Sequence, residues 1–205
     1  DEEKTKILLN WFGGKVIDFP IEKAIGKYLV NYEYHPIFVY ATEEDETKFA
    51  KYTQMMLAAF DSKSGKIIDE EIFTIGYRGR LKAISMAEVK LENISKIFNE
   101  IEDKDHTIIY CSDGKVNTEQ EEIRHLEHVL SLINNSILPL GPSVKASKFT
   151  ATEDINTRLQ LIDNFNKGKI NYLVAIRCLD EGINIPSIKS ALILSSNDNY
   201  REFVQ

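Results

Sequence analysis

Cysteine and histidine are scarce in this sequence, and positive charge is outnumbered by negative charge. The two cysteines, Cys111 and Cys178, both end predicted strands, so neither a disulfide framework nor a metal site is expected. Four scattered histidines add no cluster of metal ligands. Acidic residues outnumber basic ones and give a formal net charge of −7, which argues against a protein that coats nucleic acid through a broad basic surface.

Long apolar runs are missing too. No stretch approaches the length needed to span a membrane, and the acidic start Asp1-Glu2-Glu3 lacks the basic and apolar regions of a signal peptide. We therefore expect a cytoplasmic protein that has no membrane partner. The 43% content of hydrophobic residues is nevertheless enough for one substantial core, so one main domain with an appendage is expected.

Two motifs that bind a nucleoside triphosphate and its magnesium ion are absent as well. No Gly-x-x-x-x-Gly-Lys-Ser/Thr phosphate loop occurs, and no Asp-Glu-x-His/Asp follows a strand. Asp180-Glu181 is the nearest acidic pair, but it precedes a glycine-containing loop. We therefore expect neither a catalytic residue for ATP hydrolysis nor a magnesium ligand in these 205 residues.

What the sequence does contain is an alternation of strand and helix patterns in its second half. Short apolar runs predict strands, and runs with a 3.6-residue period between them predict helices. Because parallel strands are joined by long crossovers, this alternation indicates an α/β fold with a mostly parallel sheet flanked by helices. The predicted strands cover residues 106–112, 145–150, 172–176 and 191–194, and the predicted helices cover 119–134 and a segment that begins at Thr152 or Asp154.

The first half of the chain carries more varied patterns. Pro20 suits the first turn of a short helix, and Thr42 with Asp45 resembles a capping box at the start of another. Residues 32–40 alternate as in a strand, whose tyrosines we expect to pack in a core or on a sheet face instead of stacking on bases. Apolar residues at 3.6-residue spacing predict a helix over residues 80–102.

Polar residues on these predicted helices have ordinary explanations. Arg78 and Arg80 could meet phosphates, but a solvated helix start is the preferred interpretation. His125 and His128 share one face of the predicted 119–134 helix, and no third ligand is placed beside them. A solvated surface is therefore preferred over a metal site.

The most informative stretch is the run from Tyr172 to Ile176 and the polar loop after it. The run is apolar at every position, as expected for a strand covered on both faces of a parallel sheet. Gly182 lets main chain approach a ligand closely, and open α/β sheets bind ligands at the carboxyl ends of their strands. Taken alone, Gly182 and Pro186 are more often ordinary turn residues, so the loop needs support from its neighbours.

Segments before and after this loop supply that support. They are His106 to Ser112, Phe149-Thr150-Ala151-Thr152, Arg158, Phe165-Asn166-Lys167-Gly168 and Tyr200 to Gln205. In this order and spacing, residues 30–205 resemble the second RecA-like motor domain of superfamily 2 helicases of the DEAD/DEAH type, in the DNA-translocating branch that includes type I and type III restriction enzymes.

The resemblance covers four helicase motifs. Ile108 to Ser112 corresponds to motif IV, Arg158 to the arginine of motif IVa, and Ala175 to Pro186 to motif V. Gln205 is similar to the glutamine that opens motif VI, so the domain is expected to be incomplete just before the arginines of that motif. Two departures stand out. Ala175-Ile176-Arg177 replaces the Ala-Thr-Asp of many helicases, and Asn184 replaces the usual aspartate.

The resemblance implies a fold and a set of sites. Residues 31–205 would form a three-layer RecA-like domain, and residues 1–30 a connector with a helical segment that leads from a first RecA-like domain of the same chain. ATP would lie between the two domains, with Mg²⁺ held by the other one. The implied nucleotide-binding residues are Glu181, Gly182, Asn184 and Gln205, and the implied nucleic-acid-binding residues are Ser112, Thr150, Arg158 and Arg177.

By this resemblance the chain is part of an ATP-dependent DNA helicase or double-strand DNA translocase. A restriction or DNA-repair system with a nuclease or restriction subunit as partner would suit this branch. The 205 residues alone are expected not to hydrolyse ATP. A non-enzymatic α/β module that binds a partner or a nucleotide stays open, because the chain is acidic and lacks catalytic motifs. An RNA helicase also stays open, because backbone contacts discriminate poorly between DNA and RNA.

Overall fold

The fold is taken from a computed structural model of the chain. It describes residues 2–14, 21–27, 30–100, 105–117, 122–137, 145–176 and 185–195. The chain divides into two compact units, Asp1–Phe38 and Val39–Gln205, which we describe separately. Five residues with an expected binding role lie outside the described residues, namely Arg177, Glu181, Gly182, Asn184 and Gln205, as does Cys178.

The first unit contains two helices, α1 (Glu2–Phe12) and α2 (Ile21–Ala24). The short helix expected after Pro20 is therefore confirmed. The strand expected at residues 32–40 is wrong, because the chain has no helix or strand there and the side chains of Tyr34 and Tyr40 are 65% and 94% exposed. Alternation stabilises a strand only where a partner strand and a core are available, and the described residues provide neither for this segment.

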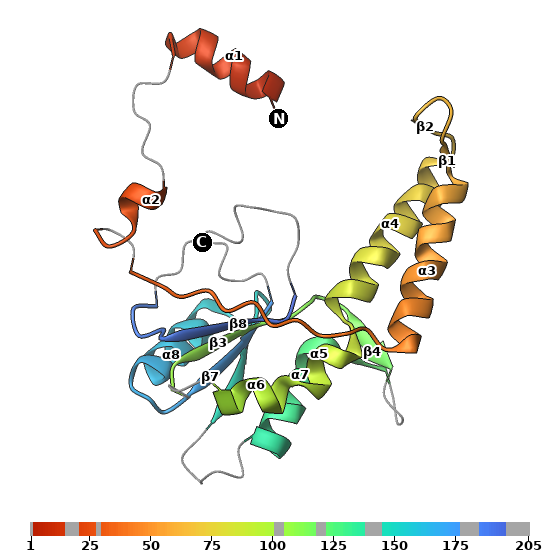
Figure 1. The fold of residues 1–205 in the computed structure, drawn as a ribbon. Coiled ribbons are helices and arrows are strands. Elements are labelled where there is room, and N and C mark those ends of the chain that lie inside the picture. Colours follow the sequence, from red (N-terminus) through yellow and green to blue (C-terminus); the bar gives the residue numbers. More distant parts are fainter. Residues whose placement is uncertain are drawn as a thin grey trace. The chain divides into compact units, whose positions relative to one another are not determined.

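The second unit begins with a helical hairpin (Figure 1). Helix α3 (Glu43–Ala58) starts at the predicted capping box, where the Asp45 backbone N–H donates to Thr42 Oγ1 over 3.1 Å. It is followed by two short antiparallel strands, β1 (Phe60–Asp61) and β2 (Lys66–Ile67), and then by α4 (Glu70–Ser85). Figure 1 shows α3 and α4 lying side by side, with β1 and β2 at the tip.

The helix predicted over residues 80–102 is wrong in both extent and continuity. Helix α4 starts ten residues earlier, at the Asp69 N-cap, and two further helices follow it, α5 (Glu88–Glu92) and α6 (Ile94–Glu100). Gly76 and Gly79 lie inside α4 because α3 packs closely there. A Cβ at Gly76 would lie 2.7 Å from the Met56 backbone nitrogen, and one at Gly79 would clash with the Tyr52 ring. These glycines permit packing and do not end the helix.

The centre of this unit is a parallel sheet of four strands in the order β6-β7-β3-β8. All four were predicted, and their parallel pairing confirms the expected RecA-like α/β fold. The register places Phe149, Ala175, Tyr110 and Ile193 side by side, so the four strands end at one level. The strands are β3 (Thr107–Tyr110), β6 (Ala146–Phe149), β7 (Tyr172–Ala175) and β8 (Ser190–Ile193).

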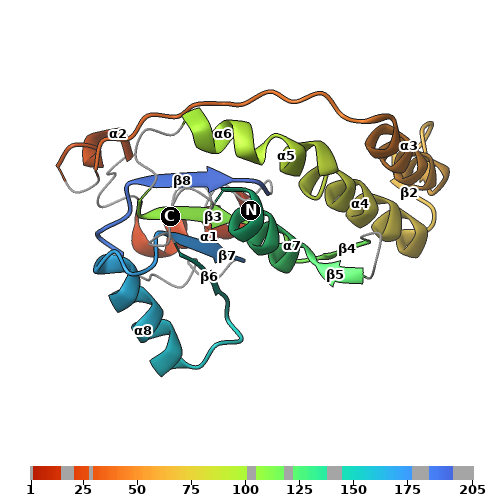
Figure 2. The ribbon, with the colours of Figure 1, turned by 90° about the horizontal axis from the view of Figure 1, so that it is seen from below.

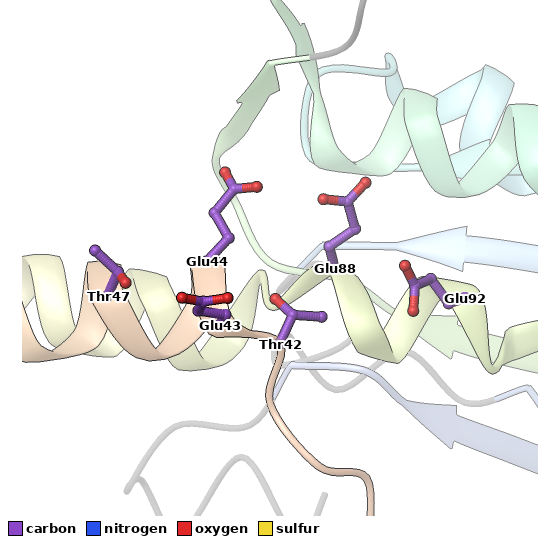
Figure 3. A pocket seen from close by; sticks show the side chains of 6 residues that line it. All are labelled: Thr42, Glu43, Glu44, Thr47, Glu88 and Glu92. Atoms are coloured by element: carbon purple, nitrogen blue, oxygen red, sulfur yellow. The ribbon is translucent and has the colours of Figure 1, made fainter.

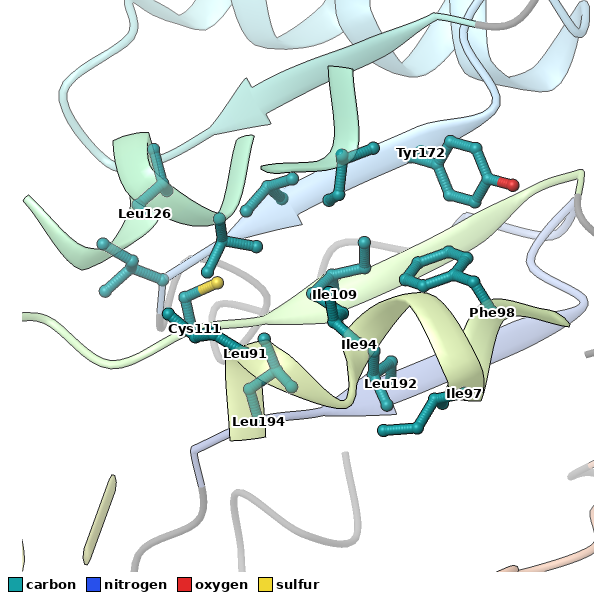
Figure 4. Close-up of a cluster of buried hydrophobic side chains, with 14 residues drawn as sticks. Leu91, Ile94, Ile97, Phe98, Ile109, Cys111, Leu126, Tyr172, Leu192 and Leu194 are labelled. Atoms are coloured by element: carbon teal, nitrogen blue, oxygen red, sulfur yellow. The ribbon is translucent and has the colours of Figure 1, made fainter. Parts of the chain in front are cut away.

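Helices cover both faces of this sheet, which gives three layers (Figure 2). On one face, α5, α6 and α7 (His125–Leu132) pack against alternate strand residues, and the Phe98 and Tyr172 rings meet edge to face (Figure 4). On the other face, Phe165 of α8 (Ile155–Asn166) packs against Ile108 and Leu173. Strand β7 is buried along its whole length, as its unbroken apolar run predicted.

The helix predicted over residues 119–134 begins later than expected. Residues Lys115–Asn117 (β4) pair with Glu122–Arg124 (β5) in an antiparallel hairpin, and α7 starts only at His125. It ends in a π-helical segment, η1 (Ile133–Ile137). This start puts His125 on the sheet side of the helix at 1% exposure, so the solvated surface expected for this histidine is wrong.

Candidate functional site

Polar residues follow the strand ends at one edge of the parallel sheet. Thr150 comes directly after β6, and Ser112 comes two residues after β3, with β7 between them. Neighbouring strands are about 4.8 Å apart, so the ends of β6 and β3 are separated by about 10 Å. The structure thus brings two of the predicted nucleic-acid-binding residues to a common edge. Arg177, which follows β7 in the sequence, lies outside the described residues.

At the end of β3, both hydrogen-bond donors of Ser112 have partners within the domain. Its backbone N–H donates to Nδ1 of His125 over 3.3 Å, and its hydroxyl lies 3.1 Å from the Ser85 hydroxyl. The single hydroxyl proton of Ser85 goes to the carbonyl of Lys82, so Ser112 is the donor to Ser85. Ser112 therefore connects β3 to α7 through His125 and to α4 through Ser85.

The imidazole of His125 is neutral. Burial, together with the nearby His128 and Lys90, lowers its pKa to about 4. Because Nδ1 accepts the Ser112 N–H, the ring proton lies on Nε2. A neutral ring suits this position, since a protonated one would present N–H to N–H. The backbone N–H of His125 also donates to the Gly114 carbonyl over 2.8 Å.

At the end of β6, Thr150 is also engaged, but by an anion. Thr150 is 4% exposed, and both its backbone N–H and its hydroxyl donate to Oε2 of Glu153, over 2.6 Å and 2.7 Å. The Thr152 N–H in turn donates to the Thr150 hydroxyl oxygen. The carboxylate of Glu153 thus occupies the two donors that were predicted to meet a phosphate.

Helix α8 begins at this same strand end. Its N-cap is Asp154, which accepts from the backbone N–H groups of Asn156 and Thr157, and the hydrogen bond from the Thr157 hydroxyl lowers the Asp154 pKa. Arg158 lies one turn further on, with its backbone N–H bonded to the Asp154 carbonyl. Two carboxylates therefore precede the first cation of this helix in the sequence, and Arg158 is half-buried.

Sequence reasoning missed the residues that hold this edge together. Glu153 stands three residues after Thr150, the Thr-x-x-Glu spacing of a capping box, so a local signal existed. His125 and Ser85 contact Ser112 from 13 and 27 residues away, and no local pattern identifies them. At the β8 end, Lys90 donates to the Leu194 carbonyl over 2.9 Å, and burial lowers its pKa.

A second feature is an open acidic pocket of about 600 Å³ beside α3 and α5 (Figure 3). Four of its six lining residues are glutamates, so its charge disfavours a phosphate-bearing ligand. The pocket is lined by Thr42, Glu43, Glu44, Thr47, Glu88 and Glu92. Beneath it, the buried Asp45 accepts from the backbone N–H groups of Thr42 and Glu88, which ties α3 to α5.

The described ranges contain neither a membrane-spanning helix nor a cluster of metal ligands. None of their helices has the length and apolar content that a membrane crossing requires. In the same ranges, no three side chains of histidine, cysteine, aspartate or glutamate come together as a potential metal site. Cys111 is buried, and burial raises the pKa of its thiol to about 12.

The chain was compared with curated proteins and with solved structures. No curated protein matches the chain. Among solved structures, the chain is similar to the Hef helicase domain of Pyrococcus furiosus, with 15% identity, TM-score 0.39, and coverage of 72% of this chain and 29% of that one. It is also similar to the C-terminal part of the Fun30 ATPase domain, with 16% identity, TM-score 0.42, and coverage of 76% and 54%. The chain thus spans about half or less of these two structures.

A family match carries the assignment. Residues 89–205 match the family described as "Helicase conserved C-terminal domain". The matched segment includes all four parallel strands, both strand ends described above and the loop after β7. It covers more than half of the sequence, so this chain belongs to the helicase conserved C-terminal domain family.

Proposed function

We propose that this chain is the second RecA-like motor domain of an ATP-dependent DNA helicase or double-strand DNA translocase, of the branch that includes restriction-enzyme motor subunits. The observation that carries the proposal is the common sheet edge where Ser112 and Thr150 follow their strands in a helicase-family domain. The proposed role is to form one wall of an ATP cleft and part of a nucleic-acid path. Restriction or DNA repair is the proposed setting, with a nuclease or restriction subunit as partner.

The nucleic-acid path follows from the kind of groups at this edge. Backbone N–H groups and hydroxyls bind phosphate oxygens without reading a base, so they can be released at each step along a strand. Ser112 and Thr150 supply such groups about 10 Å apart, and Arg158 supplies a cation near Thr150. Arg177 would add a second cation between them. Each of these four residues would therefore contact the phosphate backbone without recognising the base sequence.

The nucleotide would bind at the loop that follows β7. Glu181, Gly182 and Asn184 belong to this loop, and Gln205 would approach the same nucleotide from the end of the chain. Mg²⁺ would be held by the first RecA-like domain, because the sequence contains no phosphate loop and no acidic metal-binding motif. ATP between the two domains would draw them together, and hydrolysis would release them. Because the two domains would bind the phosphate backbone in alternation, each cycle would move the protein along the strand.

Binding of a labelled single DNA strand and of the matched RNA strand, followed by fluorescence anisotropy at rising salt, tests the path. We expect weak, sequence-independent binding that falls steeply with salt through counterion release. Ser112→Ala should weaken it about threefold, the effect of one hydrogen bond, whereas the exposed Ser62→Ala in the β1–β2 turn should not. Tight binding of one sequence that survives physiological salt would indicate a dedicated binding module instead, and absence of binding to either strand would refute the path.

The cleft needs a separate test in the intact protein. Gly182→Val should abolish most ATP turnover there, because a branched side chain blocks close approach of main chain to the nucleotide. Circular dichroism should show that the variant is still folded. Normal turnover by a folded variant would remove Gly182 from the nucleotide cleft.

A further inference from the structure

A buried histidine with a neutral ring stands behind the proposed nucleic-acid path. His125 is 1% exposed at the first turn of α7, and its Nδ1 accepts the Ser112 backbone N–H. Burying an imidazole without a partner is unfavourable, and apolar side chains surround this part of the core. A leucine could pack here without the free-energy cost of burying a polar ring, so the acceptor at Nδ1 is the property that distinguishes histidine at this position.

The turn that His125 holds is confined on its other sides as well. Met86 lies against Gly114, where an added Cβ would be 2.5 Å from the methionine sulfur. The Gly114 carbonyl accepts the His125 backbone N–H, and the Ser112 hydroxyl donates to Ser85 at the end of α4. Contacts from the end of α4 and from α7 therefore meet Ser112 and Gly114, the residues before and after Asp113. The position of Ser112 is set by these contacts as much as by strand β3.

We propose that His125 is a positioning residue of the nucleic-acid path: by accepting the Ser112 backbone N–H at Nδ1, it fixes the backbone at the carboxyl end of β3 and so the place from which the Ser112 hydroxyl can meet a phosphate. This inference rests on the proposed function, since Ser112 is its proposed phosphate contact. His125 itself touches no ligand in this scheme. Its effect on binding passes through the turn at residues 112–114, which sets the position of the Ser112 hydroxyl.

The acceptor position can be tested with three substitutions. In His125→Asn the side-chain oxygen can stand close to where Nδ1 stood, and in His125→Gln the oxygen reaches the position of Nε2 instead. His125→Leu keeps the apolar bulk and has no acceptor. A role in core packing alone would rank the leucine variant first, whereas a positioning role ranks the asparagine variant first.

Two measurements on the 205-residue chain decide between these rankings. The first is amide hydrogen exchange of Ser112 by NMR, which needs no ligand. Loss of one hydrogen bond should speed this exchange about three- to tenfold in the leucine and glutamine variants, and the asparagine variant should recover most of the protection. The second is anisotropy with the labelled DNA strand, where the affinity should fall about three- to tenfold in the same two variants and recover in the third.

The outcomes separate this inference from the proposed function. Unchanged Ser112 exchange in a folded His125→Leu variant would overturn the positioning role whatever the binding result. Faster exchange with unchanged affinity would overturn its connection to the path. Absence of nucleic-acid binding by the unmodified chain would refute the proposed function, while the exchange data would still decide whether His125 holds Ser112.

Discussion

The ends of β3 and β6 hold the same pair of donors in two different ways. Ser112 gives its N–H and its hydroxyl to two neutral acceptors, the His125 ring and the Ser85 hydroxyl, over 3.3 Å and 3.1 Å. Thr150 gives both donors to one carboxylate oxygen of Glu153, over 2.6 Å and 2.7 Å. Hydrogen bonds to an ionised acceptor are shorter and roughly twice as strong as neutral ones.

This difference indicates which strand end can bind a phosphate more easily. At β3 an incoming phosphate would replace the neutral Ser85 acceptor of the Ser112 hydroxyl with a charged one, which strengthens that bond, while the Ser112 N–H stays on His125. At β6 it would have to displace a carboxylate that is equally well bonded and that repels it. We therefore expect the end of β3 to bind first and the end of β6 to bind only when Glu153 moves away or loses its charge.

The largest expected effect concerns pH and belongs to the β3 end. Unfolded histidine takes up a proton near pH 6.5, whereas folded His125 does so only near 4 because burial, with help from His128 and Lys90, disfavours the charged ring. The contribution of the neutral His125 ring to the free energy of unfolding is fully present above pH 6.5. It is lost as the pH drops from 6.5 towards 4. The shift corresponds to about 3 kcal/mol.

Urea unfolding at pH 7 and at pH 4.5 measures this loss. The decrease should be smaller in His125→Asn, which cannot take up the proton, although carboxylates also titrate in this range and will contribute to both proteins. His106→Asn provides a matched control at another histidine of the same domain. An equal pH dependence in the wild type and in His125→Asn would show that the neutral ring is not what separates the two strand ends.

The next effect compares hydroxyl deletions at the two ends. Thr150→Val removes a buried hydroxyl bonded to a carboxylate and should lower the free energy of unfolding by about 1–3 kcal/mol. Ser112→Ala removes a half-buried hydroxyl bonded to another hydroxyl and should lower it by about 0.5–1.5 kcal/mol. Urea denaturation of both variants gives the order directly. A larger loss at Ser112 would contradict the assignment of the stronger network to β6.

The sheet could be predicted from the sequence because each strand carries its own burial signal. Residues 172–176 are apolar throughout and form the buried strand β7, and the parallel order follows from the helices between strands. Short hairpins escaped prediction. The pairs β1–β2 and β4–β5 have two or three residues each, too few for a pattern to appear. Helix α4 was misplaced because the apolar pattern was followed only from residue 80, although the helix continues through Gly76 and Gly79, where α3 packs.

The candidate site divides along similar lines. Strand ends are local features, so the common edge of Ser112 and Thr150 follows from the sequence. The acceptors that occupy their donors depend on tertiary packing, and His125 even sits at a helix start that the β4–β5 hairpin displaced. The predicted contacts of Ser112, Thr150 and Arg158 with nucleic acid stay predictions, and the next two experiments address them.

A smaller effect tests the carboxylate at the β6 end. Glu153→Gln keeps an acceptor for Thr150 but removes the negative charge, so binding of a labelled DNA strand should become about three- to tenfold tighter. Asp163→Asn is the matched control, because it removes the same charge from the other end of α8, where Asp163 pairs with Lys167. Equal gains in affinity in both variants would mean that only net charge affects binding, and that the position of Glu153 beside Thr150 has no effect of its own.

The smallest effect concerns Arg158, the one cation of helix α8, which follows the carboxylates Glu153 and Asp154 in the sequence. An arginine that neutralises a phosphate releases a counterion when it binds, so each such contact adds about 0.7 to the slope of log affinity against log salt for a single strand. Arg158→Gln should therefore lower that slope by about 0.7. Lys169→Gln removes an equal charge from the exposed turn after α8 and should leave the slope unchanged.

If both variants bind more weakly but keep the wild-type slope, Arg158 acts within the protein, and the β6 end then contributes no phosphate contact through its cation. The β3 end would in that case carry the path on this side of the sheet, and the contrast between the two ends would become one of function as well as of hydrogen-bond strength.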